Sequence, residues 1–293
     1  MASQARALLA NQMASPDVVF NQAIDAALSR DSPRRQPETP ATVDQWDLAK
    51  SMAFYRARFA DASNFTFVFV GSFTPEVIKP IVETYIASLP ATHARETWRD
   101  LDIAPSPGVV NTTIEKGVAP KSQVAIVLSG PFEYDDAHKL ALRTMSLLLQ
   151  SRLLDAIREE LGGTYSITAT PDADKFPRSQ YRVRIDWTCD PARTATLVQR
   201  VFEEIGLLKS TRLSPDQMAR LRAALLREFE ANSQDNGYLL GEIARRYADG
   251  DAAAVANVPE RIGALTADAI QLAAQTYLDT GHYVKVTLMP ESK

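Results

Sequence analysis

The sequence predicts an α+β protein made of two homologous units, each a largely antiparallel sheet packed against helices on one face. Three observations favour this fold class. Segments with helical apolar spacing alternate with short β-branched and aromatic segments. A stretch without either pattern, with Pro105 and Pro107 near its end, separates two halves. A helix–turn–strand motif occurs twice, at residues 59–65 and 277–283, which indicates repeated architecture.

Two helices are predicted at the start of the chain. Ser15 is a suitable N-cap for the first, and Pro16 occupies its first helical position. A proline-rich loop at residues 31–40 follows. Thr42 then opens the second helix, with Gln45 as the returning half of a capping box. The inner stripe expected for this helix is Trp46, Ala49, Met52, Ala53, Arg56 and Phe59.

The remainder of the first half predicts one strand and one helix. Residues 65–71 are aromatic and β-branched at successive positions, which is typical of a strand buried on both faces. Thr74 and the proline after it open a helix that Pro90 ends. The pattern is then lost up to Gly108, and we expect the domain boundary in this stretch.

The second half predicts a complete unit. Its long helix, from about Asp135 to Glu160, carries an apolar stripe from Leu142 to Ile157. Ser214 and Pro215 open a later helix, and Thr266 caps the last one. Another helix follows Asn236-Gly237. The expected strands are Val109 to Glu115, Ser122 to Leu128, Tyr165 to Thr170, Tyr181 to Thr188 and Tyr283 to Leu288.

The repeated motif also sets the expected domain organisation. Its two copies lie 218 residues apart, so one repeat is about 200 residues long. The first copy would then begin before Met1. We therefore predict that residues 1–104 are the C-terminal part of one unit, truncated at its N-terminus, and that residues 105–293 are a second, complete unit.

Composition narrows the classes of function. The hydrophobic share of 45% and charged share of 23% are those of a globular protein. A net charge of -4 argues against nucleic acid as a partner. The chain contains no apolar run of transmembrane length, so no membrane partner is expected. Cys189 is the only cysteine, which excludes an internal disulfide and a cysteine-based metal cluster.

The stretch 154–166 is the most informative part of the chain. A long helical pattern runs into Gly162-Gly163 and then into a strand that carries a tyrosine. Arg158 and Tyr165 lie seven residues apart across this junction, so both side chains can face one cleft. The glycine pair is explained as a helix end with a left-handed residue. It is not a phosphate-binding loop, because no Lys-Ser or Lys-Thr follows it.

Together with residues 65–73 and 86–90, this junction resembles the pitrilysin/insulinase family of zinc metallopeptidases, and the likeness covers nearly the whole chain. It is similar to the C-terminal part of a large bacterial member. The resemblance implies homologous α+β units paired into two bowl-shaped halves that enclose a chamber. One half carries the inverted zinc motif H-x-x-E-H. The other supplies an arginine and a tyrosine seven residues apart, a pattern that Arg158 and Tyr165 match.

The chain departs from the family in one decisive respect, since it contains no H-x-x-E-H motif. Catalytic zinc needs about three protein ligands in fixed geometry and an open position. The histidines are isolated from one another along the sequence. We expect no metal or cofactor site in this chain and zinc in the complete enzyme. The three histidines are His93, His138 and His282.

The resemblance implies roles for both residues of the pair. Tyr165 would be catalytic, donating a hydrogen bond to the substrate carbonyl oxygen that gains negative charge, and would also contact substrate. Arg158 would bind the substrate peptide with its planar guanidinium. Spacing alone favours plainer interpretations. Tyr165 is then a half-buried strand tyrosine, and Arg158 complements the helix dipole and pairs with Asp155.

Other charged residues have plainer explanations. Arg178, Arg182 and Arg184 lie in or near an alternating strand, and we interpret them as its solvated face rather than as a strip for nucleic acid. Glu159 and Glu160 are adjacent on a helix and point in different directions, so they are surface charges and not a catalytic pair.

The leading hypothesis is the non-catalytic, substrate-binding half of a zinc metalloendopeptidase. It would close over an extended peptide, add it to a sheet edge, and present Arg158 and Tyr165 to the scissile bond. Its partners would be the peptide and a zinc-binding half in the same protein or another subunit. Two alternatives remain: a zinc-free structural or assembly subunit, and the arginine–tyrosine subunit of a two-chain peptidase. Only the resemblance suggests a compartment, the periplasm.

Overall fold

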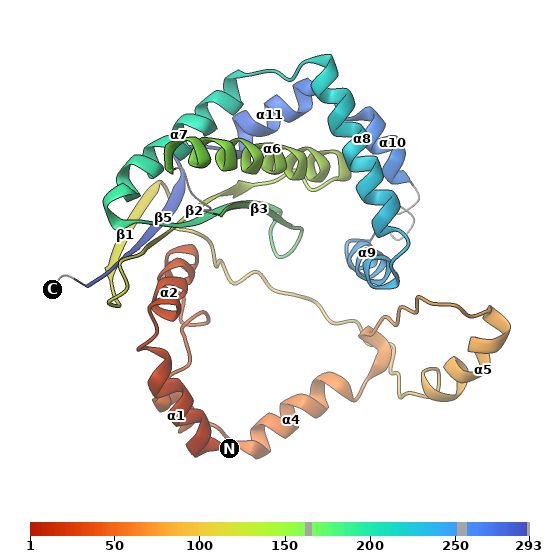
Figure 1. Cartoon of the computed structure of the whole chain (residues 1–293). Coiled ribbons are helices and arrows are strands. Elements are labelled where there is room, and N and C mark those ends of the chain that lie inside the picture. The colour runs from red at the N-terminus through yellow and green to blue at the C-terminus, as the bar shows by residue number, and fades with distance from the viewer. Residues whose placement is uncertain (162–165, 251–256, 292–293) are drawn as a thin grey trace. The chain divides into compact units, whose positions relative to one another are not determined.

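A computed structural model of the chain describes residues 1–161, 166–250 and 257–291 (Figure 1). Its strands are β1 (Val109–Glu115), β2 (Ser122–Pro131), β3 (Ile167–Asp174), β4 (Gln180–Cys189) and β5 (Tyr283–Met289). Its helices are α1 (Ala2–Gln12), α2 (Pro16–Ser29), α3 (Pro40–Val43), α4 (Leu48–Phe59), α5 (Pro75–Tyr85), α6 (Asp136–Leu161), α7 (Thr194–Ser210), α8 (Pro215–Asn232), α9 (Asn236–Ala248), α10 (Val258–Ala264) and α11 (Ala267–Tyr277). Short 3₁₀ turns occupy Ala62–Asn64 and Pro191–Arg193.

The five strands form one sheet in the order β1-β5-β2-β4-β3. The β1–β5 pair is parallel, with Val109 opposite Tyr283, and the other three pairs are antiparallel. All five predicted strands of the second half are present, with ends shifted by a few residues. The α+β fold class and the largely antiparallel sheet are therefore confirmed.

Helices α6, α7 and α11 cover one face of this sheet (Figure 1). They are held there by the apolar stripes that the sequence predicts. The stripe of α6 and the inward side chains of β4 are buried, as expected from their periods of 3.6 and 2. These buried residues are Leu142, Met145, Leu149, Leu153 and Ile157 on α6, and Tyr181, Val183, Ile185 and Trp187 on β4.

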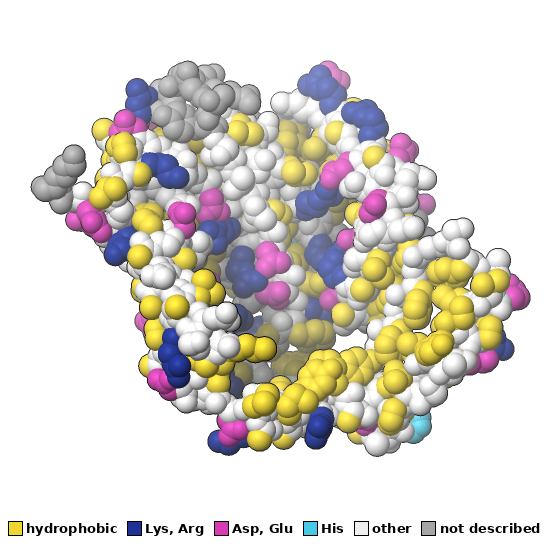
Figure 2. Space-filling view, turned by 60° about the horizontal axis from the view of Figure 1, so that its bottom comes forward, with side chains coloured by type: hydrophobic (Ala, Val, Ile, Leu, Met, Phe, Trp, Pro, Cys, Tyr) yellow, Lys and Arg dark blue, Asp and Glu magenta, His cyan; other side chains and the backbone are white. Residues whose placement is uncertain are grey.

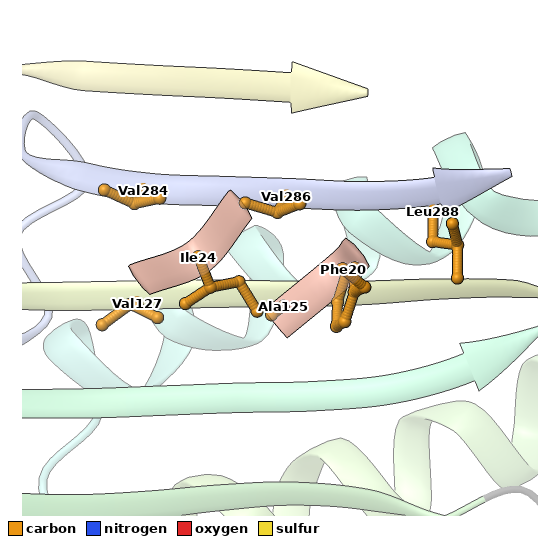
Figure 3. Close-up of a cluster of buried hydrophobic side chains, with 7 residues drawn as sticks. All are labelled: Phe20, Ile24, Ala125, Val127, Val284, Val286 and Leu288. Atoms are coloured by element: carbon orange, nitrogen blue, oxygen red, sulfur yellow. The ribbon is translucent and has the colours of Figure 1, made fainter. Parts of the chain in front are cut away.

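The opposite face of the sheet is covered in part by α2, which comes from the start of the chain (Figure 1). Phe20 and Ile24 are buried against Ala125 and Val127 of β2 and against three β5 side chains (Figure 3). The expectation that helices cover only one face is therefore wrong. The sequence could not show this packing, because α2 precedes the sheet by some 80 residues and an apolar stripe does not identify the surface that it contacts. The β5 side chains are Val284, Val286 and Leu288.

Packing divides the chain into two compact units that are each discontinuous in sequence. Unit 1 consists of Met1–Pro40, Asp100–Arg222 and Arg261–Lys293 and contains the sheet. Unit 2 consists of Ala41–Arg99 and Ala223–Glu260. The predicted division into residues 1–104 and 105–293 stays a prediction.

The structure corrects two expectations in unit 2. The helix expected from Thr42 begins at Leu48 instead, because the Asp47 carboxylate accepts a hydrogen bond from Lys50 N at 3.0 Å. None of its residues is buried, so the expected inner stripe does not face a core. Residues 65–70 form no strand and are largely exposed. A strand needs a neighbour for its backbone groups, and sequence pattern alone does not supply one.

Helices α1, α7 and α10 are not among the predicted elements. The signal for α7 was present, since Leu197, Val201, Ile205 and Leu208 recur at helical spacing and are all buried. Helix α1 gave little signal, because Leu9 is its one buried residue. Within the described part of the chain, no helix is long and apolar enough to cross a membrane.

The loop before β1 is tied to the sheet by Arg178. Its guanidinium donates to Asp100 at 2.6 Å and to Asp102 at 2.7 Å. These hydrogen bonds, first among them those from Arg178, lower the pKa of Asp100 to about 2. A depressed carboxyl pKa favours the folded loop above the unfolded value of 3.8, and this contribution is lost as the pH falls towards 2.

Replacing Arg178 with Gln should therefore raise the pKa of Asp100 towards its ordinary value. Asp102 N still donates to the same carboxylate at 2.8 Å, so part of the depression should persist. The side-chain carbon shift of Asp100, followed by NMR between pH 2 and pH 6, measures this directly. Arg212→Gln, which removes a distant pair with Asp268, is the matched control. An unchanged Asp100 titration in Arg178→Gln would show that the contact is not formed in solution.

Candidate functional site

The predicted site lies where α6 ends and β3 begins. Arg158 is in the last turn of α6, on the described backbone, but its side chain is outside the described part. Tyr165 and the glycine pair, residues 162–165, lie outside the described residues. The proximity of the Arg158 and Tyr165 side chains therefore stays a prediction. What the structure shows is the scaffold on either side.

That scaffold is firmly anchored. Leu153 and Ile157, one turn apart near the end of α6, are fully buried. Ile167, at the start of β3, is buried as well. The Gln150 amide oxygen accepts a hydrogen bond from Ala169 N at 3.1 Å, which ties the helix to the strand. Both ends of the junction are thus fixed to the core of unit 1, as a site that must hold side chains in a set geometry requires.

A buried carboxylate also holds α6 against α7. Glu204 on α7 is almost fully buried and accepts from Arg152 Nε at 2.9 Å. Arg200 approaches its other oxygen at 2.9 Å. Two guanidinium groups compensate one desolvated charge, which a single partner does less well. This contact restricts the rotation of α6 about its axis.

β3 is one of the two edge strands of the sheet, and its outer edge is protected. Ala169 N points away from β4 towards Gln150, so alternate residues of β3 direct their backbone groups outward. The next outward position is Pro171, which has no N–H to offer. Capping by a side chain and a proline both discourage strand addition. The expected addition of a peptide to a sheet edge is therefore disfavoured along the middle of β3.

The sheet face of β3 and β4 that points away from α6 is polar and charge-balanced. Arg182 contacts Asp172 and also Asp174, the latter at 3.0 Å. Arg184 pairs with Asp186 at 2.8 Å. Arg178 pairs with the two aspartates described above. Each arginine of the apparent basic strip is therefore matched by carboxylates, which agrees with its interpretation as a solvated strand face.

One cluster among the described residues has metal-ligating side chains, namely Glu133, Asp135 and His138. Asp135 caps α6 by accepting from His138 N, and it contacts Nδ1 of the same ring at 2.8 Å. Glu133 lies 3.6 Å from the other ring nitrogen, Nε2. One ligand atom from each of the three residues lies within 4.8 Å of the others, but in this structure the two carboxylates contact opposite nitrogens of the imidazole. The backbone contact of Asp135 is that of a helix cap.

The carboxylate of Asp135 shows the balance of forces in this cap. Partial burial opposes its ionisation, but hydrogen bonds from His138 outweigh that effect and lower the pKa of Asp135. His282 has a comparable structural role, because its Nδ1 accepts from Gly108 N at 2.9 Å. The contacts of both histidines are therefore structural.

Sequence reasoning missed Gln150, Glu204 and Pro171 as residues that shape this region. Gln150 and Glu204 act through contacts to other elements, and no local pattern reveals those. Pro171 was detectable, since a proline in a strand pattern indicates an edge position. However, the predicted strand ended at Thr170, one residue before this proline.

Comparison with known proteins identifies the family to which this scaffold belongs. A family model described as the peptidase M16 inactive domain matches residues 46–225, more than half of the chain. An Arabidopsis thaliana protein, "Zinc protease PQQL-like", is 23% identical over 216 residues, covering 69% of this chain and 22% of that protein. The chain therefore spans about a fifth of the length of this curated relative.

Two solved structures are similar in fold. The periplasmic protease PqqL from Escherichia coli superposes with a TM-score of 0.85 at 18% identity, over 99% of this chain and 32% of that one. The ferredoxin protease FusC, solved in complex with Arabidopsis ferredoxin, gives 0.78 at 15% identity, with the same coverage. The resemblance to pitrilysin and insulinase is thus confirmed: the chain belongs to the M16 peptidase family, as an inactive, non-catalytic domain of that family.

Proposed function

We propose that this chain forms the substrate-binding C-terminal half of a zinc-dependent metalloendopeptidase that cleaves peptides enclosed in a chamber. The observation that carries the proposal is the position of Arg158 and Tyr165 in the sequence, within the matched inactive domain. Arg158 is in the last turn of α6, a helix that buried residues and an ion pair fix in place. Such a scaffold suits side chains that bind the substrate and polarise its carbonyl but do not hydrolyse the peptide bond themselves.

The chain's own residues would bind and orient the substrate. Arg158 would hold a backbone carbonyl of the peptide through its planar guanidinium. Tyr165 would donate a hydrogen bond to the carbonyl oxygen that becomes negatively charged during hydrolysis. Because the edge of β3 is protected at Ala169 and Pro171, side chains rather than strand addition would provide most of the contact there. The bound ferredoxin of FusC supports whole proteins as well as peptides as substrates.

Zinc would be held elsewhere. The chain has no H-x-x-E-H motif, and Asp135 of the Glu133, Asp135 and His138 cluster is used as a helix cap. The H-x-x-E-H motif would lie in another part of the same protein or on a partner subunit, which the zinc protease relative supports. We propose the periplasm as the compartment, since PqqL of Escherichia coli is periplasmic.

The test uses the complete protein that carries this chain, purified from its source cells. We expect it to cleave a quenched fluorescent peptide and to lose that activity with a zinc chelator. The 293-residue chain by itself should bind the peptide without cleaving it. Absence of chelator-sensitive cleavage by the complete protein would overturn the proposal and favour the structural or assembly subunit. Cleavage that requires a second, separately encoded chain would identify the two-chain peptidase.

A further inference from the structure

A pocket lies between helices α6 and α11, at the end where α6 begins. Its volume of about 350 Å³ is within the range of small-molecule sites. Both helices belong to unit 1 and pack against each other over the sheet (Figure 1). His138, which lines the pocket, and Arg158 are 20 positions apart on α6, or roughly 30 Å along the helix. The pocket is therefore separate from the α6–β3 junction.

The walls of the pocket are formed by small apolar side chains. Ala137 and Ala141 line it from α6, and Ala269 and Ala273 line it from α11. The members of each pair are four residues apart, so they lie on one face of their helix. Alanines that face one another leave space that longer side chains would fill. The walls therefore suit an aliphatic group, which gains free energy by leaving water.

One buried polar group lines this space without a partner. Tyr277 lines the pocket, and only 4% of its surface is exposed. Its ring packs against the rings of Phe132 and Tyr181, at centroid distances of 5.4 and 4.7 Å. Its hydroxyl makes no hydrogen bond with the residues that the structure describes. A buried tyrosine hydroxyl normally has a partner, so this one is suited to a ligand.

The other polar lining of the pocket carries negative charge. Glu133 and His138 line it, and Asp135 contacts Nδ1 of the same imidazole at 2.8 Å. Glu133 lies 3.6 Å from Nε2 of that ring. One imidazole carries at most one positive charge, whereas two carboxylates face it. At least one of these carboxylates is therefore left without a cationic partner at the ring.

The nearby basic side chains are directed to a different carboxylate. Lys139 pairs with Asp136 at 3.0 Å, and Arg261 pairs with Asp136 as well. On the face of the molecule shown in Figure 2, basic and acidic side chains are likewise interspersed. The unmatched charge of Glu133 and Asp135 is therefore a local property of this pocket, and it favours a cationic ligand.

The carboxylates and the tyrosine hydroxyl act at the same place. Burial, and then the negative charges of Asp135 and Glu133, raise the pKa of Tyr277. A charge acts on a hydroxyl in this way only over a short distance. The pocket thus has three oxygen-bearing side chains near one end and apolar walls along the rest.

We propose that this pocket binds a small molecule with a primary ammonium group on a short aliphatic chain. The aliphatic chain fills the alanine-lined space. The ammonium donates hydrogen bonds to the carboxylates of Glu133 and Asp135 and to the hydroxyl oxygen of Tyr277, which uses its three donors.

Other ligand classes fit less of the pocket. An anionic ligand would meet like charge at Glu133 and Asp135. A metal ion would use these carboxylates but would leave the apolar walls unfilled. A planar guanidinium is suited to two oxygens of one carboxylate, whereas the acceptors here come from three separate side chains.

The experiment measures the binding of n-hexylammonium to the complete protein that carries this chain, by isothermal titration calorimetry. The matched probe is 1-hexanol, which has the same aliphatic chain and no charge. We expect one bound hexylammonium per chain and roughly tenfold weaker binding of hexanol, because charged hydrogen bonds are lost. Equal affinities would overturn the proposal. The readout is binding, so the result does not depend on whether the protein cleaves peptides.

Three variants locate the binding. Glu133→Gln, at an exposed position where folding is not affected, should weaken hexylammonium several-fold and leave hexanol unchanged. Ala269→Leu fills the pocket and should weaken both. Asp25→Asn, on α2 across the sheet, should change neither. Equal thermal unfolding midpoints establish that the variants are folded. Wild-type affinity in Glu133→Gln, or in folded Ala269→Leu, would overturn the proposal, because the amine would then bind elsewhere.

A blocked lysine distinguishes a free amine from a lysine side chain of another protein. The probe is Nα-acetyl-lysine methylamide, which carries the same ammonium group on a peptide unit. Weaker binding of this probe than of hexylammonium supports a free amine. Tighter binding would overturn the proposal in favour of a protein lysine.

Discussion

Replacing Tyr165 with Phe in the complete peptidase should lower turnover by roughly 10²–10³-fold, the usual effect of removing one oxyanion-stabilising donor. The phenol is the part of the side chain that donates to the substrate oxygen, and Phe keeps the ring. The hydrogen bond strengthens as charge develops in the transition state, so the loss should fall on kcat with little change in KM. Initial rates on a fluorescent peptide across a range of concentrations separate the two.

A matched tyrosine controls for nonspecific effects. Tyr247 is an exposed tyrosine on α9, a helix of unit 2, and Tyr247→Phe should leave turnover unchanged. The thermal unfolding midpoint of Tyr165→Phe should match that of the wild type. Wild-type turnover in a folded Tyr165→Phe protein would remove Tyr165 from the site and favour the plain strand tyrosine.

Replacing Phe20 with Ala should destabilise unit 1 by about 3–5 kcal/mol, the range for truncating a buried phenylalanine. Phe20 is 0% exposed and packs on Ala125 and on the central strand β5 (Figure 3). The cavity would open between α2 and the sheet, where neither partner moves freely. Small domains have a free energy of unfolding of only about 5–15 kcal/mol, so this change removes a large share of it. Urea unfolding followed by circular dichroism measures the shift in midpoint.

The control lies on the same helix. Asp25 is exposed on α2, and Asp25→Ala should change the free energy of unfolding by no more than about 0.5 kcal/mol. If Phe20→Ala unfolds at the same urea concentration as the wild type, α2 does not pack on the sheet in solution. The far face of β2 and β5 would then be open.

The second half of the fold was predictable from sequence because its elements carry their own signals. The α6 stripe and the alternation of β4 each fix one buried face, and both faces are buried as expected. The first half was harder. The pattern of residues 65–71 is that of a strand, but a strand exists only with a partner, and the described chain supplies none.

The candidate site was predictable only in part, for the same reason. The spacing of Arg158 and Tyr165 is a local property, and the family model confirms the family that this spacing suggested. Gln150 and Glu204, which fix α6 to β3 and α7, act through partners 19 and 52 residues away. Long-range pairs of this kind leave no periodic trace in a single sequence.

The place of β5 in the sheet has a consequence for synthesis on the ribosome. This strand is the last element of the chain, yet it lies between β1 and β2 near the middle of the sheet. β1 has no partner strand until β5 arrives, because β5 is its neighbour in the sheet. Non-local pairing of this sort folds slowly and leaves apolar surface open meanwhile. The nascent chain should therefore need a chaperone until β5 emerges.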